Sequence, residues 1–390
     1  MTGWAGRASR ALLPLAAVSG LVALLDLADW GAGPVRAAGL VLAAWALAVL
    51  WRRPLPPATG ARPFLLAALV LSLLRLAPAL APSPGRSPND IGATTARAVN
   101  DLDMGRPIYA VPVDPQRDLP RADPGLGYFF GYKYGPLTPR FYAPLLSALG
   151  YPRGLYAGNA LLLATAAALA ALLARRASGG GAALAAAAAT LLPGFVPYEL
   201  FSQGVNDLLP TALALGALLA AARRFGVAAG LLLGLSMAAK PLPGALFLLL
   251  LPGTVRAGPF ALGLALGLAP YLPDLWRTPR ELAANLVLFN LARPPDSTGL
   301  VAFLPGWAAP LPALVSATLI VAAAWAYHRG RRTPADLAAV SALVATLFLA
   351  GGKLIHRNYL LWWLPLAAAA LGALCYREEP SPSPPGSGPG

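Results

Sequence analysis

A carboxylate placed where a helix begins is the first group in this sequence that could do chemistry. Asp90 follows Ser87-Pro88-Asn89 and opens the segment DIGATTARAVNDLDMG. This order predicts a helix with Ser87 as its N-cap, Pro88 at the first helical position and Asp90 in a capping box. Gly105 ends the helix. The Asp90 carboxylate then either caps the helix or faces a binding site, where it can take a proton from a reacting hydroxyl group. Spacing alone leaves both readings open.

The predicted helix is amphipathic, and we expect it to lie along the membrane surface against other helices. Its polar face, by the 3.6-residue period, holds Asp90, Thr94, Arg97 and Asp101. Its more apolar face holds Ile91, Thr95, Ala98 and Leu102. The end of the helix, Asp101-Leu102-Asp103, has the D-x-D form of nucleotide-sugar enzymes, but those are normally soluble domains and this chain has none. We interpret these acids as a solvated face and predict no required metal and no cofactor.

Basic side chains that could neutralise a departing phosphate occur at two places. Lys240 lies in Lys240-Pro241-Leu242-Pro243, and Lys353, His356 and Arg357 lie in GGKLIHRNY. Proline in mid-helix removes a hydrogen bond, and broken backbone at membrane depth persists only within protein or beside a wet cavity. We therefore expect a helical V whose apex carries Lys240 into a cavity near the outer surface, with all four cations at one depth. Alternatively, Lys353 and Arg357 reach lipid headgroups and His356 is structural.

Aromatic and amide side chains supply candidates for sugar or acceptor binding. Tyr109 follows the predicted helix, and Tyr132 and Tyr134 lie in GYKYGP. Tyrosine rings stack on sugar faces, but they also anchor proteins at the lipid interface. A second polar set, between two apolar runs, consists of Gln203, Asn206 and Asp207. These side chains could hydrogen-bond a sugar, or cap the helix that follows.

The composition is that of an integral membrane protein. Of the 390 residues, 57% are hydrophobic and only 12% are charged, and the mean hydropathy is +0.61. The net charge of +14 resembles that of a nucleic-acid-binding protein, but much of the excess occurs in short arginine clusters beside apolar runs. This is the positive-inside pattern, so we exclude nucleic acid as a partner.

Apolar runs of the length that crosses a bilayer predict an all-α polytopic protein of twelve spans. They lie near residues 11–28, 35–51, 63–81, 154–174, 182–198, 208–222, 226–239, 242–255, 258–273, 301–327, 335–351 and 358–376. We expect one transmembrane domain over residues 1–376, with an extracytoplasmic loop at 82–153, and a disordered cytoplasmic tail at 377–390. A cytoplasmic N-terminus places every short arginine cluster inside, so both termini are expected there, in the cell (inner) membrane.

The order of these motifs resembles the GT-C membrane glycosyltransferases. An acidic residue after an early span and an amphipathic helix closing with G-x-x-x-Y correspond here to Asp90 and Gly105-Arg106-Pro107-Ile108-Tyr109. Within that class the chain is similar to the bacterial polyprenyl-phosphate-mannose-dependent mannosyltransferases of glycosyltransferase family 87. Their Y-x-Y-x-P-L, G-Q-x-N and K-P-x-P stretches resemble YKYGPL at 132–137, SQGVND at 202–207 and KPLP at 240–243. Members of the family usually carry an aromatic or apolar residue before or after the acid and a Tyr a few positions further on, where this chain has Asn89, Ile91 and Thr94.

The resemblance implies a GT-C-like bundle of about 10–12 transmembrane helices and a hexosyltransferase activity, with mannose as the family's sugar. Asp90 would be the general base, and Lys240, Lys353, His356 and Arg357 would bind the donor phosphate. The implied partners are membrane lipid, a polyprenyl-phosphate sugar and a glycan or glycolipid acceptor. An O-antigen-type polymerase or ligase is the alternative within enzymes. A transporter, which also uses broken helices, or a scaffold for envelope assembly is the alternative outside them.

Overall fold

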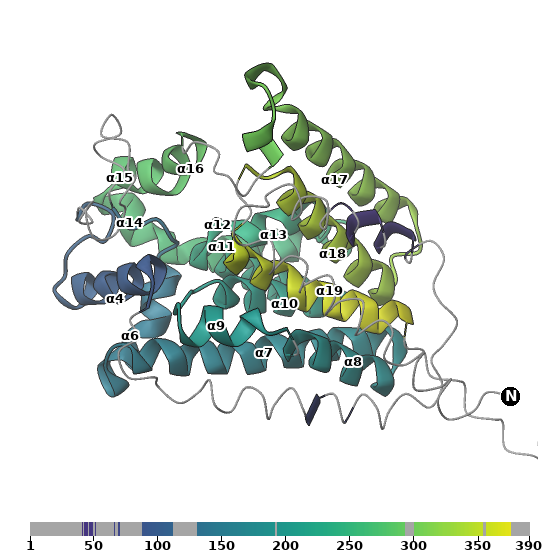
Figure 1. The fold of residues 1–390 in the computed structure, drawn as a ribbon, viewed down its shortest axis with the longest axis horizontal. Coiled ribbons are helices and arrows are strands. Elements are labelled where there is room, and N and C mark those ends of the chain that lie inside the picture. Colours follow the sequence, from purple (N-terminus) through teal and green to yellow (C-terminus); the bar gives the residue numbers. More distant parts are fainter. Residues whose placement is uncertain are drawn as a thin grey trace, which may run out of the picture.

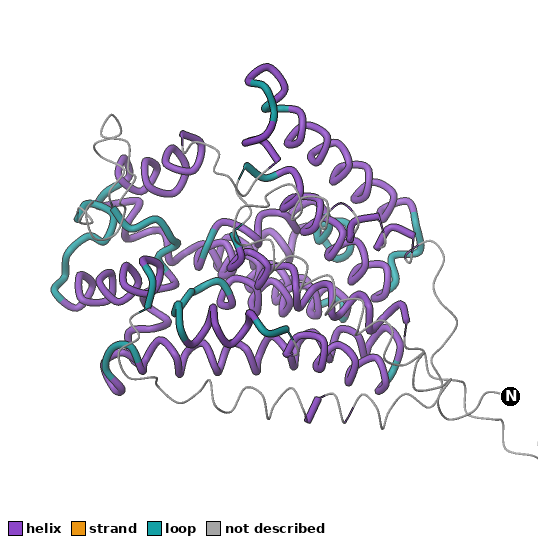
Figure 2. Tube along the Cα trace, viewed as in Figure 1, coloured by secondary structure: helices purple, strands orange, loops and turns teal. Residues whose placement is uncertain are grey.

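The computed structural model describes residues 88–111, 131–191, 193–292, 300–353 and 356–375, with isolated positions between 41 and 70. Helices account for nearly all regular structure in these ranges, and no strand occurs in them (Figure 2). The predicted spans at 11–28, 35–51 and 63–81 and the tail at 377–390 lie wholly or largely outside the described residues. The described positions within the second and third of these spans are helical. The all-α prediction is confirmed.

Long apolar helices form the body of the molecule, because helices that are apolar on all sides must face either each other or lipid. Their bounds are α7 (Arg153–Ser178), α8 (Gly180–Leu191), α9 (Phe195–Phe201), α10 (Leu208–Ala222), α11 (Gly226–Ala239), α13 (Ala257–Leu268), α17 (Leu311–Arg329), α18 (Pro334–Gly351) and α19 (Leu360–Cys375). Figure 1 shows α7 and α8 following one another along one edge, with α17, α18 and α19 beyond them. The helix α19 packs on α7, α8 and α18 and is almost wholly buried.

Four helices among the described residues are long and apolar enough to cross a membrane: Arg153–Ser178, Gly306–Arg329, Pro334–Gly351 and Arg357–Cys375. The pair α8 and α9, bent by 61°, can form a fifth span. The sequence predicted spans at each of these places, and it predicted the bounds of the shorter helices α10 and α11 to the residue. Multiple apolar helices thus make this a multi-pass membrane protein.

The predicted span at 242–255 is mostly irregular. Residues 242–255 contain the four-residue α12 (Pro241–Gly244) and a 3-10 helix, η4 (Ala245–Leu249), followed by turns. Leu242 between the two prolines has the extended dihedrals φ −102° and ψ 145°, because a residue before proline is driven out of the helical region. The second arm of the predicted V is therefore irregular, although the break itself occurs at the expected place.

A group of short helices lies at one end of the body, on the left in Figure 1. It comprises α4 (Asp90–Asp103), α6 (Leu137–Leu149), α14 (Leu272–Arg277), α15 (Pro279–Ala283), the π-helix η6 (Ala284–Leu288) and α16 (Phe289–Ala292). The sequence analysis predicted no helix at 137–149, within the loop that it placed at 82–153, and the structure has α6 there. Pro139 lies in the first turn of α6, where no backbone N–H is needed, and the helix continues through Pro144.

Candidate functional site

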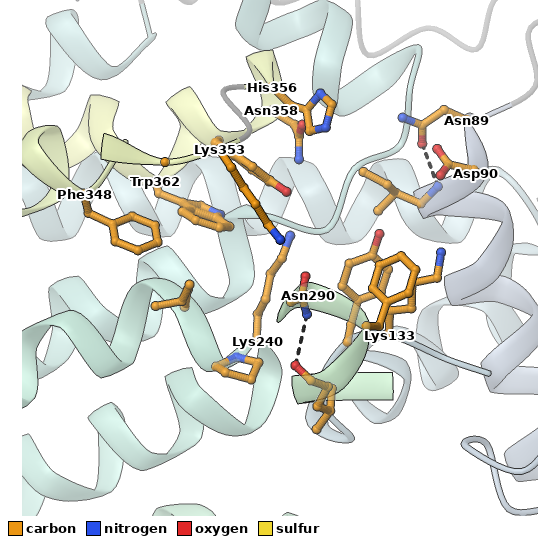
Figure 3. Close-up of a pocket in the computed structure, with 18 residues that line it drawn as sticks. Asn89, Asp90, Lys133, Lys240, Asn290, Phe348, Lys353, His356, Asn358 and Trp362 are labelled. Carbon is orange, nitrogen blue, oxygen red and sulfur yellow. Dashed lines mark hydrogen bonds between the residues drawn. The ribbon is translucent and has the colours of Figure 1, made fainter. Parts of the chain in front are cut away.

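A cavity of about 460 Å³ opens between the group of short helices and the body. Its walls come from the start of α4, the loop before α6, the break after α11, the π-helix with α16, and the segment between α18 and α19. Of the residues singled out in the sequence, the cavity is lined by Asp90, Tyr134, Lys240, Lys353 and His356 (Figure 3). The structure thus brings one acid and three of the four selected basic side chains to one hollow, from segments that lie up to 266 residues apart.

Asp90 is the first residue of α4 and is exposed to the cavity. The cap of the helix is Asn89, whose Oδ1 accepts hydrogen bonds from the backbone N–H groups of Ile91 (3.1 Å) and Gly92 (3.3 Å). The prediction of Ser87 as N-cap was therefore wrong by two residues, and Ser87 itself lies outside the described residues. Because Asn89 satisfies the first N–H groups, the Asp90 carboxylate does not have to serve as the cap.

The other acids of α4 are divided between the interior and the surface. Asp101 is only 3% exposed and lies 2.5 Å from the guanidinium of Arg106, so its interpretation as part of a solvated face was wrong. Asp103, two residues further along the helix, is exposed as expected. Met104 and Gly105, the latter with φ +70°, end the helix at the predicted place. Within the described ranges, no group of three or more His, Cys, Asp or Glu side chains could hold a metal ion.

Lys240 reaches the cavity because the helix stops beneath it. The helix α11 ends at Ala239, and Lys240 is extended, with φ −159° and ψ 126°. Its ammonium group lies 2.6 Å from Oδ1 of Asp207 and faces three aromatic rings, with centroids at 4.9 Å for Tyr134, 5.0 Å for Trp362 and 5.5 Å for Tyr359. A cation held this way is oriented by one carboxylate and several π faces.

Asp207, predicted to bind sugar or to cap a helix, lies within the protein interior. It precedes α10 but makes no side-chain cap hydrogen bond, and it is completely buried. Besides Lys240, its carboxylate accepts hydrogen bonds from the Asn358 side-chain amide (2.8 Å) and the Trp362 indole (2.7 Å). A buried carboxylate needs such partners. Asp207 therefore lies beneath the cavity and joins α10 to the α11 break and to α19.

The segment after α18 supplies two further basic groups to the cavity. Lys353 donates a hydrogen bond to the backbone oxygen of Leu291 in α16 (2.9 Å), and His356 packs edge-on against Tyr359, with ring centroids 5.4 Å apart. Arg357 does not line the cavity. Its Nε donates to Glu199 (2.7 Å) and its guanidinium lies over the Tyr198 ring, so the expected convergence of four cations is wrong for Arg357.

The three selected tyrosines have different positions. Tyr134 lines the cavity, whereas Tyr109 and Tyr132 are each 2% exposed and form a buried cluster beneath it. The Tyr109 hydroxyl donates to the backbone oxygen of Tyr134 (2.8 Å), which fixes the loop. Burial raises the pKa of Tyr134 well above its ordinary value, and the negative charges of Asp90 and Asp207 add to this. Tyr134 therefore presents a neutral phenol to the cavity.

Gln203 and Asn206 bind protein rather than facing the cavity. The Gln203 amide donates to the Tyr198 hydroxyl (2.8 Å), and the Asn206 amide donates to the hydroxyl of Thr95 in α4 (3.0 Å). The backbone oxygen of Gln203 also accepts a hydrogen bond from the N–H of Asn89 (2.9 Å). These contacts attach the start of α4 to the 202–207 turn, so both residues help to position Asp90 instead of lining the site.

Sequence reasoning missed several residues that line the cavity: Asn89, Lys133, Phe289, Asn290, Asn358 and Trp362. Lys133 lies over the Phe289 ring, with its ammonium 4.4 Å from the centroid. Phe289 and Asn290 follow directly on a π-helix, a form often found at functional sites. The signal available in the sequence was the pair of asparagines in the apolar segment ANLVLFNLA, which lies between the predicted spans at 258–273 and 301–327.

The arrangement of the helices defines the class of fold: this is an all-α membrane protein with a GT-C-like fold. It is similar to two crystal structures of ArnT from Cupriavidus metallidurans. The structure of ArnT bound to undecaprenyl phosphate superimposes with a TM-score of 0.56 at 16% identity, covering 80% of this chain and 60% of that one. The apo structure gives 0.50 at 18% identity, covering 81% and 59%. The chain thus spans about 60% of the length of these neighbours. No protein-family model and no curated protein sequence matches the chain.

Proposed function

We propose that this chain is a glycosyltransferase that moves a hexose, mannose by the resemblance to family 87, from a polyprenyl-phosphate sugar to a hydroxyl group of a lipid or glycan acceptor. The observation that carries the proposal is the cavity that joins Asp90 to Lys240, Lys353 and His356. A glycosyl transfer from a lipid phosphate requires a base for the acceptor and cations for the leaving group, and both are present there. The GT-C-like fold, shared with a protein crystallised with undecaprenyl phosphate, supports the same proposal.

The proposed reaction is a single displacement. Asp90 takes the proton of the acceptor hydroxyl as its oxygen attacks the anomeric carbon, and the bond from that carbon to the phosphate oxygen breaks. The bonding electrons leave with the lipid phosphate, whose charge is stabilised by Lys240, Lys353 and His356. Inversion at the anomeric carbon follows from a displacement with one step, as the resemblance implies. Tyr134, held neutral, can donate a hydrogen bond to the sugar.

The proposed setting is the cell membrane, with the cavity on its extracytoplasmic side and both termini in the cytoplasm. The arginine distribution supports this orientation. A reporter enzyme fused after residue 100 tests it, because α4 must then be outside. A cytosolic reporter would contradict the proposed orientation.

The test of the activity is to incubate the purified protein with a panel of polyprenyl-phosphate sugars and membrane extract, and to follow a radiolabelled product. Asp90→Asn should lower turnover by about two to four orders of magnitude, since it removes the base and leaves the shape intact. The matched control is Asp103→Asn, which removes an exposed carboxylate from the same helix. Near-normal turnover of Asp90→Asn would remove Asp90 from the mechanism. Growth of a polyprenyl-diphosphate-linked glycan would favour a polymerase, and vectorial movement of an unchanged substrate would favour a transporter.

A further inference from the structure

Asp207 is a buried acid to which the proposed reaction gives no role. Its side chain is fully buried, yet it touches the one lysine that stands at the helix break, with 2.6 Å between Oδ1 and Nζ. The Lys240 side chain is 13% exposed and lines the cavity. Lys240 therefore presents its positive charge to the cavity as part of an ion pair with no net charge. The negative partner, Asp207, is buried behind it.

We propose that Asp207 is a positioning and charge-compensating residue, which orients Lys240 and weakens the site's hold on the lipid phosphate so that the spent carrier can leave. This inference rests on the proposed function, in which Lys240 contacts the phosphate. A lysine ammonium has three protons. With one directed to Asp207, the others remain available to a phosphate oxygen on the cavity side.

The magnitude of the compensation follows from distance. A phosphate oxygen in contact with Lys240 would lie about 3 Å from Nζ, and hence about 6 Å from the Asp207 carboxylate on the far side of the ammonium. Two unit charges about 6 Å apart change a binding constant roughly a hundredfold at an effective dielectric constant of about 20, and severalfold in water. For a cavity that is open to solvent on one side, we expect an effect on the order of tenfold.

Asparagine at position 207 isolates the charge from the geometry. It keeps one carbonyl oxygen for the Trp362 indole, and the Asn358 side-chain amide can turn to present its own oxygen to the new amide group. The rings of Tyr134, Tyr359 and Trp362 still surround the Lys240 ammonium. Asp207→Asn should therefore bind phosphate more tightly, whereas damage to the structure would weaken binding.

The experiment measures the dissociation constant of undecaprenyl phosphate for the full-length protein in detergent. Asp207→Asn should bind this lipid about tenfold more tightly than the wild type, and its turnover should fall because product release is slower. The matched control is Glu199→Gln. Glu199 is also buried and also forms an ion pair with a basic residue, with 2.7 Å between its Oε1 and Nε of Arg357. Neither residue lines the cavity, so the affinity for undecaprenyl phosphate should not change.

A second comparison covers the case in which Asp207→Asn does not fold. Lys240→Met leaves the Asp207 charge buried without its cation, and the double variant Lys240→Met/Asp207→Asn removes that charge. The double variant should bind undecaprenyl phosphate more tightly than Lys240→Met alone. Unchanged or weaker binding on removal of the Asp207 charge, with a wild type that binds the lipid, overturns this inference and leaves the proposed function intact. A wild type that does not bind the lipid overturns the proposed donor site and this inference together.

Discussion

Asn285 joins the π-helix η6, which lines one side of the cavity, to the segments that contain Tyr109 and Gly131. Replacing Asn285 should therefore destabilise that side of the cavity. The residue lies in the π-helix η6 and is completely buried. Its Oδ1 accepts a hydrogen bond from the N–H of Gly131 (2.9 Å), and its Nδ2 donates to the backbone oxygens of Tyr109 (3.2 Å) and Glu281 (2.8 Å). Two of these bonds therefore cross from the π-helix to other segments, one to Tyr109 after α4 and one to Gly131 before α6.

The loss of stability expected for Asn285→Ala follows from the two buried backbone groups that lose their hydrogen-bond partner. The N–H of Gly131 and the carbonyl of Tyr109 are buried, and a buried polar group left without a partner destabilises the fold by about 1–3 kcal/mol. Relaxation of the structure and entry of water reduce the summed cost of the two groups, so we expect the free energy of unfolding to fall by roughly 2–4 kcal/mol. The effect should be local, because Leu286, Phe289 and Asn290 line the cavity on the same segment. Donor KM should rise more than kcat falls.

Hydrogen exchange of the peptide that contains Gly131, measured on the protein in detergent, reports this local loss of stability directly. A loss of about 2 kcal/mol or more corresponds to exchange roughly thirtyfold faster, and the apparent Tm should fall as well. Asn290→Ala is the control, since that side chain is exposed and bonds only to Leu286 within its own turn (3.0 Å). Unchanged exchange at Gly131 in Asn285→Ala would refute the proposal that Asn285 holds the Gly131 segment against the π-helix η6.

Two further substitutions test packing and charge near the cavity. Gly135→Ala should reduce turnover roughly tenfold or more, because a Cβ atom there would clash with the backbone oxygen of Ala238 and push the Tyr134 loop away from the Lys240 break. Gly181→Ala is the control, since a Cβ there meets nothing within 4 Å, and it should leave turnover unchanged. Asp274→Asn should raise the apparent Tm at pH 7, because burial raises the pKa of Asp274 although Arg140 opposes this. A raised pKa means that the folded protein gains protons, and stability, as pH falls through it, so the advantage of the variant should shrink toward about pH 4. A variant less stable than the wild type at pH 7 would show that the bond to Arg140 outweighs burial.

The sequence predicted the helices well where apolar runs have sharp ends. The helix α10 is an uninterrupted apolar segment between Asp207 and the pair Arg223-Arg224, and α11 runs from Gly226 to the proline after Lys240. Charge and proline stop a helix for reasons that are local in the chain. The helix α6 was not predicted. It has Pro139 in its first turn, where proline is tolerated, and Pro144 in its interior, where proline is normally unfavourable, so residue type alone does not show that this segment is helical.

The site was harder to predict than the fold, because burial depends on partners distant in sequence. Asp90 and Lys240 could be selected from local signals, a helix start and a helix break. Nothing local distinguishes Asp207, which looks like a helix cap in the sequence, from a carboxylate that holds Lys240, Asn358 and Trp362 across 155 residues. In the same way, Tyr109 and Tyr134 carry the same ring, and only packing decides that one supports the cavity and the other faces it.

Lys240 and Lys353, two of the lysines that line the cavity, are held in different ways, and this difference bears on how a site can both bind and release an anion. Lys240 donates to a buried carboxylate at 2.6 Å, so its charge is compensated from within the protein. Lys353 donates to the backbone oxygen of Leu291 at 2.9 Å. When a lipid phosphate enters, Lys240 keeps its hydrogen bond to Asp207 and can direct its remaining protons to the phosphate. Lys240 should therefore contribute more to the orientation of the leaving oxygen than to the attraction of the donor.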